Sequence, residues 1–209
     1  MPRNKEEIRK RLQWAALELF RERGYEETTA AEIAAKAGVT ERTFFRHFPD
    51  KREVLFDGEA AFCQALTAAV RDAPEALGPL DTLFVAFNSV KQMFVENRPF
   101  TEPRQQVIAS NPALQERAAA KTRSLIAAVA SALCERGLTP PQASLAAQLG
   151  MATLSHGVAA WFNHGSVDLG EHIARAFQEA RNLSSSSIPL AKGKPKNPRH
   201  PGAGGRAKV

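Results

Sequence analysis

The chain has 209 residues, of which 44% are hydrophobic and 24% charged, so it is long enough to bury a core and has an ordinary globular composition. Its net charge of +6 comes entirely from six basic residues after Leu183, a region without any acidic residue. The rest of the chain is neutral overall, which excludes a broadly basic protein and requires any nucleic-acid surface to be a local patch.

Cysteine usage and hydropathy exclude two further classes. Cys63 and Cys134 lie far apart, and no secretory signal follows the charged N-terminus. No apolar run approaches the roughly 18 residues of a membrane span. We therefore expect a reduced, cytoplasmic protein that does not enter a membrane.

Four helices are predicted in the first part of the chain. Apolar residues recur at three- and four-residue steps over residues 5–23, and Gly24 follows. Thr29 and Glu32 form a capping-box pattern at the start of a short helix that stops at Gly38. Thr40 caps a third helix over residues 41–47, and Asp50 is expected to cap a continuous fourth helix over residues 51–71. Two short helices joined by a glycine-containing turn are the helix-turn-helix arrangement.

Five more helices are expected over residues 80–96, 99–109, 112–136, 140–163 and 169–183, each bounded by Pro, Gly or Asn. The predicted fold class is all-α. An N-terminal three-helix, helix-turn-helix domain (residues 1–50) precedes a C-terminal helical bundle (51–183). Residues 184–209 are rich in Ser, Lys, Pro and Gly and are predicted to be a disordered basic tail, which either attracts DNA phosphates or only solubilises the chain.

The N-terminal segment resembles the DNA-binding region of the TetR family of repressors over about the first 55 residues. The resemblance is carried by Thr29, Ile33, Ala34, Ala37, Gly38, Val39, Thr40, Thr43, Phe44, Phe45, His47, Phe48, Lys51, Val54 and Leu55. It implies a DNA-binding transcriptional regulator, and by analogy with most of the family a repressor, in which the helix over 41–47 enters the major groove.

The face of this helix that is not needed for the core presents the candidate DNA contacts Thr40, Arg42, Thr43, Phe45 and Arg46. The resemblance favours Thr40, Arg42 and Thr43 for base contacts. The family commonly has Tyr where this chain has Phe45, so a hydroxyl that reaches a phosphate is absent and the role of Phe45 stays open.

Three further residues are candidate phosphate contacts, namely Thr29, His47 and Lys51. The alternative interpretation is that Thr29 and Thr40 act only as helix caps and that Arg42 and Arg46 are solvated charges.

The C-terminal half resembles the family less closely. Residues 112–117 and 154–162, the latter with Trp161, are similar to a subgroup associated with acyl-coenzyme A ligands. The candidate lining of an apolar ligand pocket is Phe62, Phe84, Phe87, Met93, Phe94, Val107 and Trp161, although each also suits an ordinary core.

Family resemblance also implies a homodimer formed through the helices over 140–163 and 169–183. Two recognition helices have to meet successive major grooves, about 34 Å apart on a palindromic operator. The small residues of the first of these helices permit a close approach of helices either between two chains or within one chain.

Two other function classes compete with a regulator. An enzyme is disfavoured, because the sequence has no phosphate loop, nucleophile motif or metal-ligand spacing, and no cofactor is expected. A sequence-nonspecific architectural DNA-binding protein is the alternative to a regulator, and it would bind operator and random DNA equally well.

Overall fold

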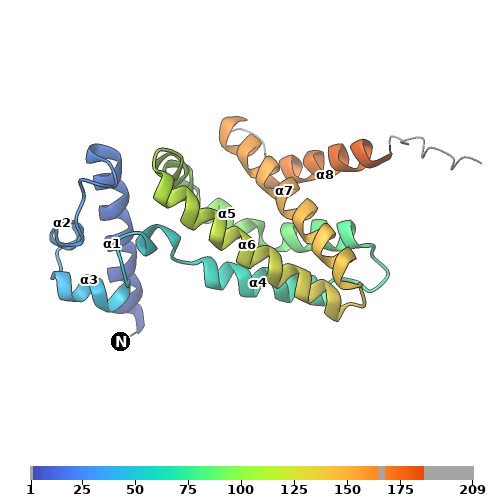
Figure 1. Ribbon diagram of the computed structural model, residues 1–209, viewed down its shortest axis with the longest axis horizontal. Coiled ribbons are helices and arrows are strands. Elements are labelled where there is room, and N and C mark those ends of the chain that lie inside the picture. Colours follow the sequence, from blue (N-terminus) through green and yellow to red (C-terminus); the bar gives the residue numbers. More distant parts are fainter. Residues whose placement is uncertain (1, 165–167, 186–209) are drawn as a thin grey trace, which may run out of the picture.

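The computed structural model describes residues 2–164 and 168–185, and over these residues the chain is helical without strands, as the sequence predicted. The elements are α1 (Pro2–Arg23), α2 (Ala30–Lys36), α3 (Glu41–His47), the 3-10 helix η1 (Glu53–Phe56), α4 (Glu59–Asp72), α5 (Pro79–Ala109), α6 (Pro112–Glu135), α7 (Pro140–His164) and α8 (Leu169–Ser185). Figure 1 shows α1, α2 and α3 gathered at one end of the molecule and α4 to α8 forming a helical bundle beside them.

The first three helices follow the sequence pattern closely. Leu12, Ile33 and Phe44, one from each helix, are fully buried together. Both predicted caps form, since the hydroxyls of Thr29 and Thr40 accept the backbone N–H groups of residues 32 and 43. We call α1 to α3 with η1 the head. The helix-turn-helix arrangement is therefore confirmed.

The prediction of one continuous helix over residues 51–71 was wrong. The carboxylate of Asp50 accepts the backbone N–H groups of Arg52 and Glu53 at 2.7 and 3.1 Å, and this cap starts only the short η1. Gly58 then adopts a left-handed conformation (φ +87°), which no residue inside an α-helix does, and α4 begins after it. The break lets Val54, Leu55 and Phe56 turn together into the core of the head.

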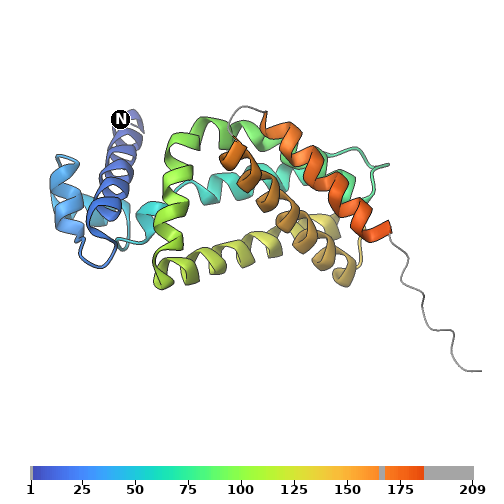
Figure 2. The same ribbon diagram turned by 90° about the horizontal axis from the view of Figure 1, so that it is seen from above.

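The prediction of two helices over 80–96 and 99–109 was also wrong, because α5 runs through Pro99 and Pro103. A proline inside a helix removes one backbone hydrogen bond and bends the axis, and Figure 2 shows α5 turning sharply along its length. The two ends of α5 are anchored in different cores. Leu83 and Phe87 are buried in the bundle, whereas Val107 is buried in the head.

The remaining helices lie where they were expected. Helices α6, α7 and α8 surround a core that includes Phe87, Leu133, Trp161 and Phe177. Helix α7 passes very close to α8 at Gly157, where a Cβ atom would come within 3.2 Å of the α8 backbone. Helix α8 extends through Ser185, and the rest of the predicted tail, residues 186–209, lies outside the described residues.

None of the described helices has the length and apolar character needed to cross a membrane.

Candidate nucleic-acid interface

The two sides of α3 differ sharply in exposure, and this difference defines the candidate interface. Phe44 is 0% exposed and packs against the ring of Phe48, at 5.7 Å between centroids. Its neighbour Phe45 is 51% exposed. Thr40, Arg42 and Arg46 are exposed on the same outer side as Phe45, and Thr43 is half-buried. The structure thus brings together the five residues predicted for this face.

Thr40 and Thr43 are tied to each other at the start of α3. Their hydroxyl oxygens lie 3.0 Å apart, and the hydroxyl of Thr40 also accepts the backbone N–H of Thr43 at 3.2 Å. Capping therefore occupies part of the hydrogen-bonding capacity of Thr40. The pair forms a fixed polar edge next to the exposed Arg42.

The turn before α3 is held from behind by α1. Gly38 has a left-handed conformation (φ +67°), and the guanidinium of Arg11 donates a hydrogen bond to the carbonyl of Ala37 beside it. A Cβ atom at position 38 would lie 2.7 Å from the Arg11 guanidinium. The turn between α2 and α3 is thus packed directly against the Arg11 side chain of α1.

Thr29 is exposed, but its hydroxyl is already engaged in the capping box of α2. It donates to the carboxylate of Glu32 at 2.9 Å, and this carboxylate also accepts the backbone N–H of Thr29 at 2.8 Å. These hydrogen bonds lower the pKa of Glu32. The structure accounts for Thr29 as a cap, one of the two roles that the sequence allowed.

His47, predicted from the sequence as a phosphate contact, lies on the inner side of α3. It is 8% exposed, and neither ring nitrogen has a hydrogen-bond partner. It borders a small hollow of about 190 Å³ together with Arg9, Asp57 and Lys121. Burial lowers the pKa of His47 from its ordinary value, and the charges of Arg9, Arg46 and Lys5 lower it further, against a smaller opposing effect of Asp57.

A neutral, buried His47 predicts acid sensitivity of the fold. The folded pKa lies below the ordinary value of 6.5, so the unfolded chain takes up the proton first as the pH falls. The stabilisation is complete above about pH 6.5 and is lost as the pH falls toward the lower folded pKa. Urea unfolding at about pH 7 and about pH 5 should therefore show a smaller loss of stability for His47→Gln than for the parent chain. An equal loss for the two chains would contradict this, and His156→Gln, at an exposed position, is the control.

Lys51 is also turned inward. Its ammonium group donates to the backbone carbonyls of Tyr25, Glu26 and Thr28 and lies over the Tyr25 ring. The predicted phosphate contact is thus held against the loop between α1 and α2 in the chain without DNA.

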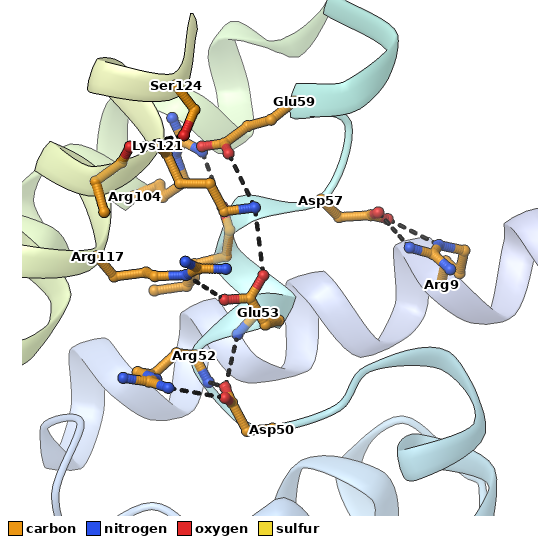
Figure 3. A network of polar contacts seen from close by, with 12 residues as sticks. Arg9, Asp50, Arg52, Glu53, Asp57, Glu59, Arg104, Arg117, Lys121 and Ser124 are labelled. Atoms are coloured by element: carbon orange, nitrogen blue, oxygen red, sulfur yellow. Dashed lines mark hydrogen bonds and ion pairs between the residues drawn. The ribbon is translucent and has the colours of Figure 1, made fainter.

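An ion network joins the head to the bundle, as Figure 3 shows. Glu53 of η1 pairs with Arg117 at 2.5 Å and with Lys121 at 3.4 Å, both from α6. Lys121 also pairs with Glu59 at the start of α4, at 3.3 Å. The hydrogen bond from Arg117 lowers the pKa of Glu53, whereas burial raises that of Glu59.

Two further contacts extend this connection. Arg104 of α5 donates to the carbonyl of Leu55 at 2.8 Å, and Arg9 of α1 pairs with Asp57. These contacts carry no local sequence pattern, because their partners are about fifty residues apart. The Arg104 hydrogen bond connects η1 to α5, and the Arg9 pair connects α1 to the segment that leads into α4.

The seven candidate pocket residues do not form one group. Phe87 and Trp161 are buried in the bundle core, and Phe62, Phe84, Met93 and Phe94 pack against it. Val107 belongs to the head core instead, because it lies beyond the bend of α5. Within the described residues, no group of three His, Cys, Asp or Glu side chains could hold a metal ion.

Two protein families match the chain. The family of bacterial regulatory proteins named tetR matches residues 14–57, which contain most of the head. The MftR C-terminal domain matches residues 77–182, more than half of the chain.

Two curated relatives share part of the sequence. The chain is 44% identical to the HTH-type transcriptional regulator TcmR of Streptomyces glaucescens over 75 residues, 36% of this chain and 33% of that protein. It is 36% identical to the HTH-type transcriptional repressor BepR of Brucella suis biovar 1 (strain 1330) over 107 residues, 49% of this chain and 47% of that protein. The matches span a third to a half of the length of these relatives, and both relatives are regulators rather than enzymes.

Solved structures share the fold. The complex of SmeT with triclosan superposes with a TM-score of 0.58 at 22% identity, over 84% of this chain and 90% of that one. Thermus thermophilus FadR in complex with lauroyl-CoA superposes with a TM-score of 0.50 at 24% identity, over 93% of this chain and 100% of that one. From its family matches, the chain belongs to the TetR family of bacterial transcriptional regulators.

Proposed function

We propose that this chain is a transcriptional repressor that binds a palindromic operator as a homodimer and is released by a small apolar or amphipathic ligand. The observation that carries the proposal is the exposed face of α3, with Arg42, Thr43, Phe45 and Arg46 opposite a fully buried Phe44. A short helix with a rigid back and an exposed basic and apolar front suits the major groove.

Arg42 and Arg46 supply the donors that recognise guanine, and the methyl group of Thr43 with the ring of Phe45 offers apolar contact to thymine methyl groups. The exposed Thr40 and Thr29 lie at the starts of α3 and α2 and are the remaining proposed contacts, and the sequence also predicted phosphate contacts from His47 and Lys51. Because His47 and Lys51 are turned inward, a direct phosphate contact from either requires its side chain to leave its present environment.

The ligand class is supported by the aromatic bundle and by the relatives. Phe62 and Phe94 pack edge to face at 5.1 Å between α4 and α5, so a ligand among them would press on both helices. FadR is described with lauroyl-CoA and SmeT with triclosan, both of which carry apolar groups. An acyl-coenzyme A is therefore the first ligand class to test.

Release follows from linkage between the two sites. A ligand that prefers a bundle in which η1 is displaced lowers DNA affinity by the same factor by which DNA lowers ligand affinity. The ion network from Glu53 to α6 and α4 supports such coupling, because it connects the head to both helices.

Dimerisation is proposed through α7 and α8. Leu145 is 69% exposed and Leu149 37% exposed on α7, and the exposed Ala152 and Ala159 continue the same helix face. Positions 145, 149 and 152 follow the three- and four-residue spacing of one helical stripe, and position 159 lies seven residues further along it, beyond the exposed His156. A largely apolar stripe on an outer helix suits a partner surface.

Substituting Leu145→Glu and Leu149→Glu together should abolish the dimer, because two carboxylates per chain would be buried without partners. Analytical ultracentrifugation should show a monomer, with helicity by circular dichroism retained. The matched control is Val95→Glu, 37% exposed on α5, which should leave the dimer intact. A dimer that persists in the double variant would place the interface elsewhere.

The test of the function is a salt-titrated gel shift of the full chain on the DNA upstream of its own gene, with random DNA as competitor. A regulator should prefer its operator by roughly a thousandfold or more. The addition of acyl-coenzyme A thioesters of increasing chain length, and separately of triclosan, should release the DNA and identify the ligand class. If selection from a random library also yields no preferred site, the architectural alternative replaces the regulator.

A further inference from the structure

The ammonium group of Lys51 is fully coordinated by the backbone. It lies 2.7 Å from the carbonyl oxygen of Tyr25, 3.2 Å from that of Glu26 and 2.9 Å from that of Thr28. A lysine ammonium has three N–H donors, and here each has one acceptor. The positive charge also lies 4.2 Å from the centre of the Tyr25 ring, within the range of a cation–π interaction.

These contacts join the two segments that flank the helix-turn-helix. The three carbonyl groups belong to the loop between α1 and α2, and Lys51 follows α3. The turn that carries Lys51 is itself fixed, since the Asp50 carboxylate accepts the N–H groups of Arg52 and Glu53. Lys51 therefore connects the start of α2 to the end of α3 across some 25 residues of sequence.

We propose that Lys51 is a positioning residue for DNA recognition, which fixes the orientation of α2 and α3 before DNA arrives, and that it is not a phosphate ligand. The proposal rests on the proposed DNA-binding function. A phosphate contact would require Lys51 to give up charge-assisted hydrogen bonds that are already complete. The side chain instead reduces the motion of the loop that leads into α2, so the loop loses less conformational entropy when DNA binds.

The geometry favours lysine over arginine at this position. Three carbonyl groups converge on one point, which suits a compact ammonium, whereas the donors of a planar guanidinium diverge. If Lys51 bound a phosphate, arginine could replace it, because arginine binds phosphate at least as well as lysine does. The conservative variant Lys51→Arg therefore separates the two roles.

The experiment compares the full chain with Lys51→Arg, Lys51→Met and the control Arg46→Ala, which removes an exposed charge from α3. Circular dichroism first checks that each variant is folded. Hydrogen exchange of residues 25–32 is then measured without DNA, and the affinity for the selected operator is measured as a function of salt concentration.

We expect both Lys51 variants to exchange faster than the parent chain over residues 25–32 and to bind the operator on the order of tenfold more weakly. Lys51→Arg should keep the salt dependence of the parent chain, because its charge is kept. Arg46→Ala, which removes a proposed base contact, should weaken operator binding while hydrogen exchange over residues 25–32 stays unchanged.

Two results would overturn the proposal. Parent-like operator binding by Lys51→Arg, with a reduced slope for Lys51→Met, would make Lys51 a phosphate ligand. Faster exchange in both variants without any loss of affinity would make its role structural only. Failure of the proposed function is distinguishable, since the parent chain itself would then show no preferred DNA sequence.

Discussion

Replacing Phe44 by alanine should lower the free energy of unfolding by about 3–5 kcal/mol, the usual cost of removing a fully buried aromatic side chain. Phe44 is 0% exposed and lies among residues of α1, α2 and η1, so the cavity would open at the centre of the head. Urea unfolding followed by circular dichroism measures the loss. Since domains are stable by only about 5–15 kcal/mol, DNA binding should be lost well below the parent melting temperature.

The matched control is Phe45→Ala, which removes the same ring from the next position of α3. Because Phe45 is half exposed, its removal should cost less than about 1 kcal/mol of stability. Equal destabilisation by the two substitutions would contradict the assignment of Phe44 to the core and Phe45 to the outer face.

Replacing Arg42 by alanine should weaken operator binding by about 1–3 kcal/mol, or roughly five- to 150-fold, with a smaller effect on random DNA. Arg42 is exposed next to the fixed pair of Thr40 and Thr43, where a guanidinium can pair with a guanine edge. Competition gel shifts at constant salt concentration measure both affinities. Specificity should relax at one operator position.

Arg123→Ala, on the exposed surface of α6, is the control for the loss of one positive charge. It should leave the ratio of operator to random affinity unchanged. If Arg42→Ala weakens binding to both DNAs equally, Arg42 contacts phosphate and a different residue reads the bases.

The helices of the head could be predicted from the sequence because their ends are determined locally. Thr29 and Thr40 cap the starts of α2 and α3, and Gly24 and Gly38 lie just past the ends of α1 and α2. Each of these signals acts within a few residues of the helix end. The apolar spacing over residues 5–23 is local in the same sense, and Leu12 and Phe20, two of the apolar residues in that pattern, are buried. The exposed face of α3 then followed from knowing which side is buried.

The surroundings of His47 and Lys51 could not be predicted in the same way. Whether a polar side chain points outward depends on distant partners, such as Arg9 for the His47 region and the Tyr25 carbonyl for Lys51. The residues next to His47 and Lys51 in the sequence do not indicate which distant groups they contact. The same limit applies to the ion pairs of Glu53 with α6.

The prolines of α5 predicted the helix boundaries only in part. A proline pattern indicates where helical hydrogen bonds are missing, but not whether the helix stops or bends there. Helix α5 continues through Pro99 and Pro103, and the rings of Trp14 and Phe100, 5.5 Å apart between centroids, pack the second half of the helix against α1. Tertiary packing determined the outcome.

The anchoring of α5 in both cores affects how regulators of this kind can be recombined. Val107 of α5 and Leu114 of α6 are buried in the head, although they follow Phe56 by more than fifty residues. A chimera that joins this head to another effector bundle at residue 58 would leave that core incomplete. The exchangeable module therefore comprises residues 2–58 with the corner where α5 meets α6, the part of α5 that Figure 2 shows beside the head. Grafts that include this corner should keep the core of the head complete. Hybrid sensors should therefore have a crossover after residue 58 and two more, one in α5 before the corner and one in α6 after it.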